Sequence, residues 1–324
     1  MQRLRVTCTM VALGVIALGD PALGSAEPAR AVKVTVLSTM LAGNPGRGIG
    51  EWGFAALLEV DGRRLLLDTG ERPETVLRNA GELGIDLSDV TDLVITHNHG
   101  DHTAGLVTLR RELAKKNARA LSRTHVARGI FDRRPRPDGS EGNGLLPLKA
   151  AYEALGGHFI EHAGPTQLLP AVWLTGPVPR QYPERNWSDT GRVQTAGGLV
   201  EDTVPEDASV IVDTADGLIV VSGCGHAGVI NTIEYARKVV REAPVLAAVG
   251  GFYLFAANDA TLEWTGNKLK AFGLRYLLGA HCTGLEAVYR LRTMLGLTRK
   301  TAVVGAVGSS FTLGTGISAL SLAG

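Results

Sequence analysis

The sequence lacks several features that mark specialised classes of protein. It has three cysteines in 324 residues, and because Cys8 lies near the N-terminus, Cys224 and Cys282 are the one later pair that could form a disulfide bond. The formal net charge is +1, and beyond residue 26 the basic and acidic residues are equal in number. This balance excludes a sequence-wide attraction to nucleic acid or to anionic lipid.

Long apolar runs, short-period repeats and low-complexity tracts are also missing beyond residue 26. No later stretch has the roughly 20 apolar residues that a membrane-spanning helix requires, so we expect no stable insertion into a membrane. No ferredoxin-like or flavin-binding extension is visible, which counts against electron transfer. With 45% hydrophobic residues, the chain has enough apolar material for an ordinary globular protein.

The N-terminus has the pattern of a secretory signal peptide. Arg3 and Arg5 precede an uncharged run over residues 6–19, and small residues follow at positions 24–26. We predict a signal peptide over residues 1–26, a mature domain over residues 27–324, and a periplasmic or secreted location. A membrane anchor is the alternative, but the apolar run is short for one. Cys8 lies at the start of this run rather than after it, so lipidation is not expected.

Two successive halves of the mature chain show strands mixed with helices. The elements expected in the first half are strands at residues 32–38, 52–60, 64–67 and 92–96 and helices at residues 73–83 and 104–116. Those expected in the second half are strands at residues 209–213, 218–222, 245–249 and 275–278 and helices at residues 229–241, 260–272 and 285–295. Two sheets packed face to face with helices outside would bury both patterns. We therefore predict an α/β fold, a four-layer αββα sandwich, in one domain.

Between the halves, residues 128–146 are rich in Gly, Pro, Arg and Asp. The segment is too long for an ordinary connection, so we expect a lid or a mobile surface loop. Arg133, Arg134 and Arg136 within it would either clamp an anionic substrate or, as the simpler interpretation, stay solvated.

The chemistry concentrates in a short motif between a predicted strand and a predicted helix. The motif contributes four side chains that can bind metal, namely His97, His99, Asp101 and His102. Imidazole nitrogens together with a carboxylate suit divalent zinc, with iron or manganese as alternatives. The motif therefore predicts a centre of one or two divalent ions.

One loop cannot complete a coordination sphere, so further ligands must come from elsewhere in the chain. His226 and His281 each follow a predicted strand, where a sheet-based site gathers its ligands. Cys224 lies two residues before His226, and Cys282 directly follows His281. We predict His226 and His281 as ligands and treat a disulfide between the cysteines as the less favoured alternative. Three roles stay open for Cys224: bridging two ions, binding one as a thiolate, or lining the site.

The order of these motifs resembles the metallo-β-lactamase superfamily across nearly all of the mature chain. The resemblance rests on Asp68-Thr69-Gly70, the motif of residues 97–102, Cys224-Gly225-His226 and His281. Gly223-Cys224-Gly225-His226, Gly250-Gly251-Phe252 and His281-Cys282-Thr283-Gly284 are similar to the branch of dihydropterin ribofuranosyl-aminobenzene phosphate synthases.

The resemblance implies a ligand set. His97, His99 and a third histidine, assigned to His226, would hold one ion, and Asp101, His102 and His281 would hold the second. Asp68 would support the metal loop through hydrogen bonds without touching an ion.

This chain departs from the family pattern at two positions. Cys224 stands where a bridging aspartate is expected, so a single tightly held ion is an alternative to two. Tyr253 replaces a histidine in the Gly-Gly-Phe-His-Leu segment of related sequences, and tyrosine can donate a hydrogen bond to the substrate but cannot act as a base near neutral pH. Packing is the equally simple role for Tyr253. His125, His158 and His162 belong to no motif and are expected to be structural or exposed.

The ligand set favours hydrolysis, because a bound dication lowers the pKa of water towards about 7 and polarises a carbonyl or phosphoryl oxygen. Asp101 would hold one ion and orient the nucleophile. We therefore expect a hydrolase of a small-molecule ester, lactone, amide or phosphoester. A synthase or transferase like the pterin branch and a noncatalytic metal-binding module are the alternatives. The oligomeric state is left open.

Overall fold

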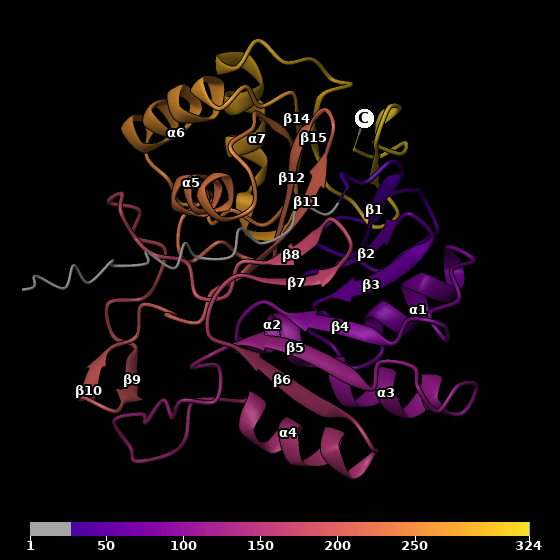
Figure 1. Ribbon diagram of the computed structural model, residues 1–324, viewed down its shortest axis with the longest axis vertical. Coiled ribbons are helices and arrows are strands. Elements are labelled where there is room, and N and C mark those ends of the chain that lie inside the picture. Colours follow the sequence, from indigo (N-terminus) through magenta and orange to yellow (C-terminus); the bar gives the residue numbers. More distant parts are fainter. Residues whose placement is uncertain (1–26, 324) are drawn as a thin grey trace, which may run out of the picture.

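The structure of the protein is a computed structural model that describes residues 27–323 (Figure 1). The predicted signal peptide, residues 1–26, lies outside the described residues, so this assignment stays a prediction. No helix in the described range combines the length and apolarity that crossing a membrane would need.

The first sheet has eight strands and is built mainly from the N-terminal half of the chain. Its strands are β1 (Val32–Ser38), β2 (Ala55–Val60), β3 (Arg63–Leu67), β4 (Asp92–Ile95), β5 (Arg123–Ala127), β6 (His158–His162), β16 (Ser310–Thr312) and β17 (Gly316–Ser318). Their order across the sheet is β17-β16-β1-β2-β3-β4-β5-β6. The pairs from β3 to β6 are parallel, so β4 and its neighbours end at the same edge of the sheet.

The second sheet has seven strands from the C-terminal half. Its strands are β7 (Thr166–Leu169), β8 (Val172–Leu174), β11 (Ser209–Thr214), β12 (Gly217–Ser222), β13 (Val245–Gly250), β14 (Tyr276–Gly279) and β15 (Ala302–Val304), in the order β15-β14-β13-β12-β11-β8-β7. A separate hairpin consists of β9 (Arg192–Thr195) and β10 (Gly198–Glu201).

Helices cover the outer face of each sheet (Figure 1). The first sheet is covered by α1 (Thr75–Glu82), α3 (Leu106–Ala114) and α4 (Leu145–Ala154), and the second by α5 (Val229–Val239), α6 (Asp259–Ala271) and α7 (Leu285–Met294). Two short helices follow strand ends, namely α2 (Gly100–Thr103) and the 3₁₀ helix η1 (His281–Thr283). One apolar cluster lies between the sheets and joins β1–β4 to β8 and β11–β14. A second cluster lies between the first sheet and its helices, and a third lies between the second sheet and its helices. Three apolar layers between four structural layers confirm the predicted αββα sandwich.

Several strands are continuous apolar runs in the sequence because both of their faces are buried. All six residues of β11, β12 and β13 are buried, because one face of the second sheet meets the first sheet and the other meets α5, α6 and α7. The elements predicted in both halves are confirmed, with shifts of a few residues at their ends. The helix expected at residues 104–116 corresponds to α3, and α2 is an additional short helix that ends directly before the predicted range.

The C-terminal segment does not follow the division of the chain into two halves, each forming its own sheet. β16 and β17 leave the second half and join the first sheet, where Thr35 of β1 pairs with Ser310 of β16. The sequence also did not predict α4, β15 or the strands from β5 to β10. Among these, β6, β7, β9 and β10 are short and mostly exposed or only partly buried. Such strands carry little apolar pattern.

The register of the second sheet brings two site-bearing loops to the same level. Ser222 at the end of β12 pairs with Gly250 of β13, and Gly250 pairs with Gly279 at the end of β14. The loops after β12 and β14 therefore leave the same edge of the sheet side by side. A Cβ on Gly250, whose φ is +114°, would lie 2.0 Å from the carbonyl oxygen of Ser222, so this close approach requires glycine.

Candidate metal centre

The motif of residues 97–102 lies in the turn between β4 and α2. His99 has an extended backbone and immediately precedes α2, while Asp101 and His102 lie within that helix. The turn therefore directs several polar side chains to one side. His97 and His102 are fully buried, whereas His99 and Asp101 are partly exposed. The centre is thus reachable from solvent on the side of these two residues.

His97, His99 and His226 form a first cluster, with one ligand atom of each within 4.8 Å of the others. The Nε2 atom of His97 lies 3.1 Å from Nδ1 of His99 and 3.2 Å from Nε2 of His226. The structure therefore brings together three histidines from two loops that are far apart in the sequence.

The hydrogen bonds behind this cluster determine which ring nitrogens carry lone pairs. Thr96 donates its hydroxyl proton to Oδ2 of Asp68, so its oxygen accepts from Nδ1 of His97 at 3.0 Å. Nδ1 of His226 donates to the backbone oxygen of Asn186 at 2.5 Å. The Nε2 atoms of both histidines are then unprotonated, and their lone pairs point towards each other. This arrangement fits a cation between them.

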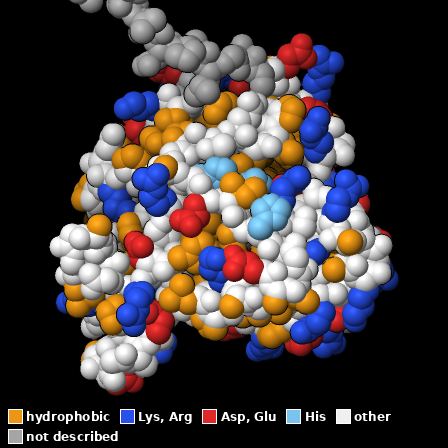
Figure 2. All heavy atoms as spheres, turned by 60° about the horizontal axis from the view of Figure 1, so that its bottom comes forward, with side chains coloured by type: hydrophobic (Ala, Val, Ile, Leu, Met, Phe, Trp, Pro, Cys, Tyr) orange, Lys and Arg blue, Asp and Glu red, His pale blue; other side chains and the backbone are white. Residues whose placement is uncertain are grey.

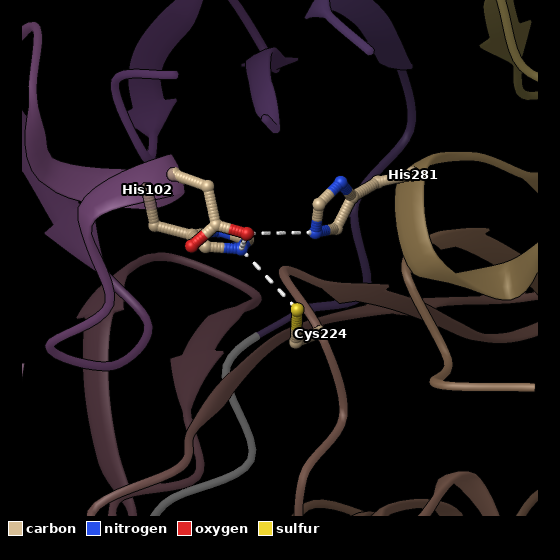
Figure 3. A group of neighbouring side chains, drawn as sticks. His102, Cys224 and His281 are labelled. Carbon is tan, nitrogen blue, oxygen red and sulfur yellow. Dashed lines mark hydrogen bonds and ion pairs between the residues drawn. The ribbon is translucent and has the colours of Figure 1, made fainter. Parts of the chain in front are cut away.

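Asp101, His102, Cys224 and His281 form the second cluster (Figure 3). Nε2 of His102 lies 3.2 Å from the Cys224 sulfur, and Nε2 of His281 lies 3.3 Å from Oδ2 of Asp101. Neither ring nitrogen of His281 makes a well-formed hydrogen bond among the described residues, and Asp101 is the ion-pair contact of Nε2. A buried imidazole without hydrogen bonds is costly, and a metal ion shared with Asp101 would satisfy it. The donor set therefore fits a second divalent ion.

Burial keeps the histidines of the first cluster in the form that binds metal. It lowers the pKa of His97 and of His226 well below the ordinary value, and it lowers the pKa of His99 to about 4. These rings are therefore neutral near pH 7. Burial alone would raise the pKa of Asp101, but the adjacent His102 and His281 outweigh it and hold the pKa below its ordinary value, so the carboxylate is ionised.

Asp68 supports both clusters from behind. Its Oδ1 accepts the backbone N–H of Thr96 at 2.8 Å, and its Oδ2 accepts from Nδ1 of His102 at 2.8 Å. Asp68 and His281 both have a backbone in the left-handed region, with φ values of +55° and +44°. Such strain in non-glycine residues concentrates at functional sites.

The two cysteines are free thiols in this structure. Their sulfurs lie 3.3 Å apart, and both side chains are buried. The alternative of a disulfide bond is therefore not realised here, and Cys224 instead contributes to the second cluster. Whether its sulfur binds one ion, bridges two or lines the site stays open.

Tyr253 lies beside the first cluster. Its ring centroid is 4.9 Å from that of His226 and 5.3 Å from that of Phe255, and the side chain is partly exposed. Its backbone is also left-handed, with φ of +51°. This position is compatible with both predicted roles, since the ring packs on a cluster histidine and remains accessible.

The remaining histidines lie away from both clusters. His125 and His162 are on neighbouring strands, β5 and β6, and their ring nitrogens are 3.0 Å apart. The other nitrogen of His125 is 3.0 Å from Oδ1 of Asp92. His158 begins β6 and is exposed. These contacts agree with a structural or exposed role for the three.

The arginines of residues 128–146 differ in their surroundings. The interpretation that all three are solvated is wrong for Arg134, which is buried and donates to Asp202 at 2.8 Å and to Glu206 at 2.7 Å. These ion pairs tie the loop to the segment after β10, and they pair the charge of Arg134 with carboxylates of the protein itself. Arg133 and Arg136 are exposed.

Two supporting residues could not be found from the sequence. Asn186 contacts His226 through its backbone carbonyl, an atom that every residue has. Thr96 directly precedes the motif, but nothing in its identity signals the link between Asp68 and His97.

On the face of the molecule shown in Figure 2, histidine side chains lie among apolar and basic side chains.

Comparisons with known proteins agree with this architecture. The model of the metallo-β-lactamase superfamily matches residues 53–237. The 7,8-dihydropterin-6-methyl-4-(β-D-ribofuranosyl)-aminobenzene-5′-phosphate synthase of Methanocaldococcus jannaschii is 27% identical over 264 residues, 79% of this chain and 89% of the relative. An uncharacterised protein of the same organism is 28% identical over 240 residues, 74% of this chain and 86% of the relative.

Solved structures share the fold at lower identity. A metal-dependent hydrolase of the β-lactamase superfamily superposes with a TM-score of 0.68 at 24% identity, covering 86% of this chain and 98% of the other. Zn²⁺-bound PqqB from Methylobacterium extorquens gives a TM-score of 0.53 at 14% identity, covering 86% and 99%. At these identities the likeness concerns the fold alone.

Proposed function

The chain belongs to the metallo-β-lactamase superfamily, and we propose that it is a metal-dependent hydrolase of a small-molecule ester, lactone, amide or phosphoester. The observation that carries the proposal is the pair of ligand clusters, in each of which ligand atoms from distant segments of the chain lie within 4.8 Å of one another. Members of this superfamily bind divalent metals, and a set of imidazoles, a carboxylate and a thiol suits zinc.

In the proposed centre, His97, His99 and His226 hold one ion, and Asp101, His102 and His281 hold a second, with Cys224 as a further donor. A bound divalent ion supplies Lewis acidity, which lowers the pKa of water from about 16 to about 7 and polarises the bond to be cleaved.

Asp101 is the residue that orients the nucleophile in this proposal. Its carboxylate is ionised and partly exposed, so an oxygen can accept a hydrogen bond from the attacking water and direct its lone pair at the substrate. Asp68 and Thr96 act behind the ligands, where they fix the ring orientation and the proton positions of His102 and His97.

Tyr253 is proposed to donate a hydrogen bond to the charge that develops on the substrate. Burial raises its pKa above the ordinary value of 10, so the phenol stays protonated throughout the neutral range. A neutral donor beside the first cluster can stabilise an oxyanion but cannot remove a proton from water.

A synthase like the relative from Methanocaldococcus jannaschii is the second candidate function. The 27% identity across 89% of that protein favours it. Tyr253 in place of a histidine argues for different chemistry, as does the export that we propose from residues 1–26, since pterin and phosphoribosyl precursors are cytoplasmic.

Metal analysis joined to a substrate panel tests the proposal. The purified protein should retain one or two equivalents of a divalent metal and should hydrolyse at least one of a lactone, a phosphodiester, a carboxylic ester or a β-lactam. Loss of turnover on chelation and recovery with zinc are expected. A metal-loaded protein that hydrolyses none of these but forms a ribofuranosyl-aminobenzene 5′-phosphate product would support the synthase instead.

A further inference from the structure

Two different surfaces flank the metal centre, and of their residues the hydrolysis proposed above uses Tyr253 alone for the reaction itself. One is a cavity with basic side chains next to His99. The other is a group of exposed aromatic side chains next to His281 and His226. Because each surface adjoins ligands of the same metal centre, a substrate held at the centre would touch both.

The basic surface is a cavity of about 520 Å³ that opens on His99. Its walls come from the loop of residues 128–146 and from the start of the β9–β10 hairpin. Arg136 and Arg192 line it, and both are exposed. These two cations come from segments that are far apart in the sequence and share one cavity beside a proposed ligand.

Neither arginine forms an ion pair within residues 27–323, although Asp138 is close enough to Arg136 for that positive charge to help lower the pKa of the Asp138 carboxyl. Arg136 donates to the backbone oxygen of Glu141 at 3.1 Å, and Arg192 donates to the backbone oxygens of Asp189 and Gly191 at 3.0 and 2.7 Å. Carbonyl contacts hold the guanidinium groups in place while leaving other N–H donors free.

The acidic residue that lines the same cavity does not compensate for them. Asp202 and Glu206 both pair with the buried Arg134, which also lines the cavity. The cavity therefore presents two guanidinium groups that form no ion pair, and in a recess such groups favour an anion.

The aromatic surface consists of Trp52, Tyr253 and Phe255. Trp52 is 41% and Phe255 48% exposed, and their ring centroids are 5.6 Å apart. The ring of Trp52 is also 4.9 Å from that of His281. Large aromatic side chains left in water next to a polar centre mark a surface that a ligand covers.

Tyr253 extends this apolar surface into a further cavity. The cavity has a volume of about 500 Å³, and its walls include Leu254 and Trp264. The aromatic side therefore offers depth as well as area to an apolar group. The ring centroids of His99 and His226 are 4.8 Å apart, so the basic and aromatic sides meet at the first cluster.

We propose that the substrate is an amphipathic anion, with a planar apolar group against Trp52 and Phe255 and an anionic group between Arg136 and Arg192. This inference rests on the proposed function, because it places the cleaved bond between the two groups, over the metal centre. Arginine binds phosphate and carboxylate groups with the same forked pair of N–H donors, so the anionic group of the substrate is a phosphate or a carboxylate.

Binding of small probes tests this assignment without requiring turnover. The probes for calorimetric titration of the metal-containing protein are 1-naphthyl phosphate, 1-naphthoate, 1-naphthol and inorganic phosphate. At least one naphthyl anion should bind about tenfold more tightly than 1-naphthol and than inorganic phosphate. Comparing 1-naphthyl phosphate with 1-naphthoate shows which anion the arginines prefer.

Variants separate the two surfaces. The double substitution Arg136→Gln and Arg192→Gln should weaken binding of the naphthyl anion about tenfold and leave 1-naphthol unchanged. Phe255→Ala should weaken both naphthyl probes and leave inorganic phosphate unchanged. Arg128→Gln removes an exposed arginine of the same loop that does not line the cavity, and it should change nothing.

The proposal is overturned if the double variant binds the naphthyl anions as the wild type does, or if no naphthyl anion binds more tightly than 1-naphthol. Circular dichroism of each variant shows whether the fold is retained. A protein that binds the probes as expected but hydrolyses no ester, lactone, amide or phosphoester would contradict the proposed function and leave the amphipathic site standing.

Discussion

The carboxylate of Asp68 lies 2.8 Å from Nδ1 of His102, and both side chains are fully shielded from solvent. The contact fixes Nδ1 as the protonated nitrogen, so Nε2 presents its lone pair to Asp101 and Cys224. Since Asp68 also accepts from Thr96, which in turn accepts from His97, a single carboxylate sets the proton positions behind both clusters.

Asp68→Asn should lower metal affinity about 10- to 100-fold while the protein stays folded. An amide in this position presents a donor to a donor, so His102 loses its fixed orientation. Competition with a chromogenic chelator measures the affinity. An unchanged affinity would show that the ring of His102 is held by packing alone.

His99→Ala should abolish turnover and lower the metal content. The side chain supplies one of three ligand atoms in the first cluster, and two imidazoles bind a divalent ion weakly. His158→Ala is the matched control, because His158 is exposed at the start of β6 and contacts neither cluster. Elemental analysis and activity assays on both variants should differ, and equal losses would undo the ligand assignment.

Cys224→Ser should change the metal stoichiometry only if the thiolate binds metal. Its sulfur is 3.2 Å from Nε2 of His102 and serine is a poorer ligand, so we expect loss of the second ion and retention of the first. Cys282→Ser tests the neighbouring thiol, which belongs to neither cluster. Stoichiometry by elemental analysis decides between the roles left open for Cys224.

Arg134→Met should destabilise the protein by about 3 kcal/mol, because it leaves Asp202 and Glu206 buried without their cation. Arg133→Met is the control, since Arg133 is exposed and pairs with Glu141 at the surface, where such a pair contributes at most about 1 kcal/mol. Urea denaturation measures both. Equal midpoints for the two variants would contradict the structural role of Arg134.

Stability should depend on the protonation of Glu184. Burial raises the pKa of this side chain from 4.5 to about 7, although the backbone N–H groups of Ile230 and Asn231 at the start of α5 favour its charged form. Folding therefore takes up a proton between these values. The contribution of Glu184 to the free energy of unfolding is fully present below pH 4.5 and is lost as the pH rises through about 7.

Glu184→Gln should flatten this pH dependence, because the amide cannot ionise. Urea denaturation at several pH values between 4.5 and 8 measures the slope. Glu153→Gln, at an exposed helical position, should leave the slope as it is in the wild type. A slope that Glu184→Gln does not change would show that another group titrates in this range.

The parts of the molecule that the sequence predicted are those with a local signal. The motif of residues 97–102 combines rare side chains at short spacing, and His226 and His281 follow buried strands that read as apolar runs. The ends of parallel strands meet at one edge, which brings the loops after β12 and β14 together in the second sheet. The motif of residues 97–102 follows β4 of the first sheet, so its convergence with them depends on how the two sheets pack.

The parts that it did not predict depend on contacts between distant residues. Nothing around Arg134 shows that it meets Asp202 and Glu206, because a polar loop has the same composition whether or not it is buried. The contact of His226 with the carbonyl of Asn186 involves no side-chain chemistry at Asn186. Short strands such as β9 and β10 bury too few residues to produce an alternating apolar pattern in the sequence.

The pairing of β16 with β1 has a kinetic consequence. The central strands of the first sheet form from neighbouring segments, but β1 gains its second partner only when the distant β16 reaches it. Ordering so long a loop is slow compared with closing hairpins. Until that step, β1 presents an open edge that can recruit strands of other molecules, so aggregation during refolding competes with the last pairing event.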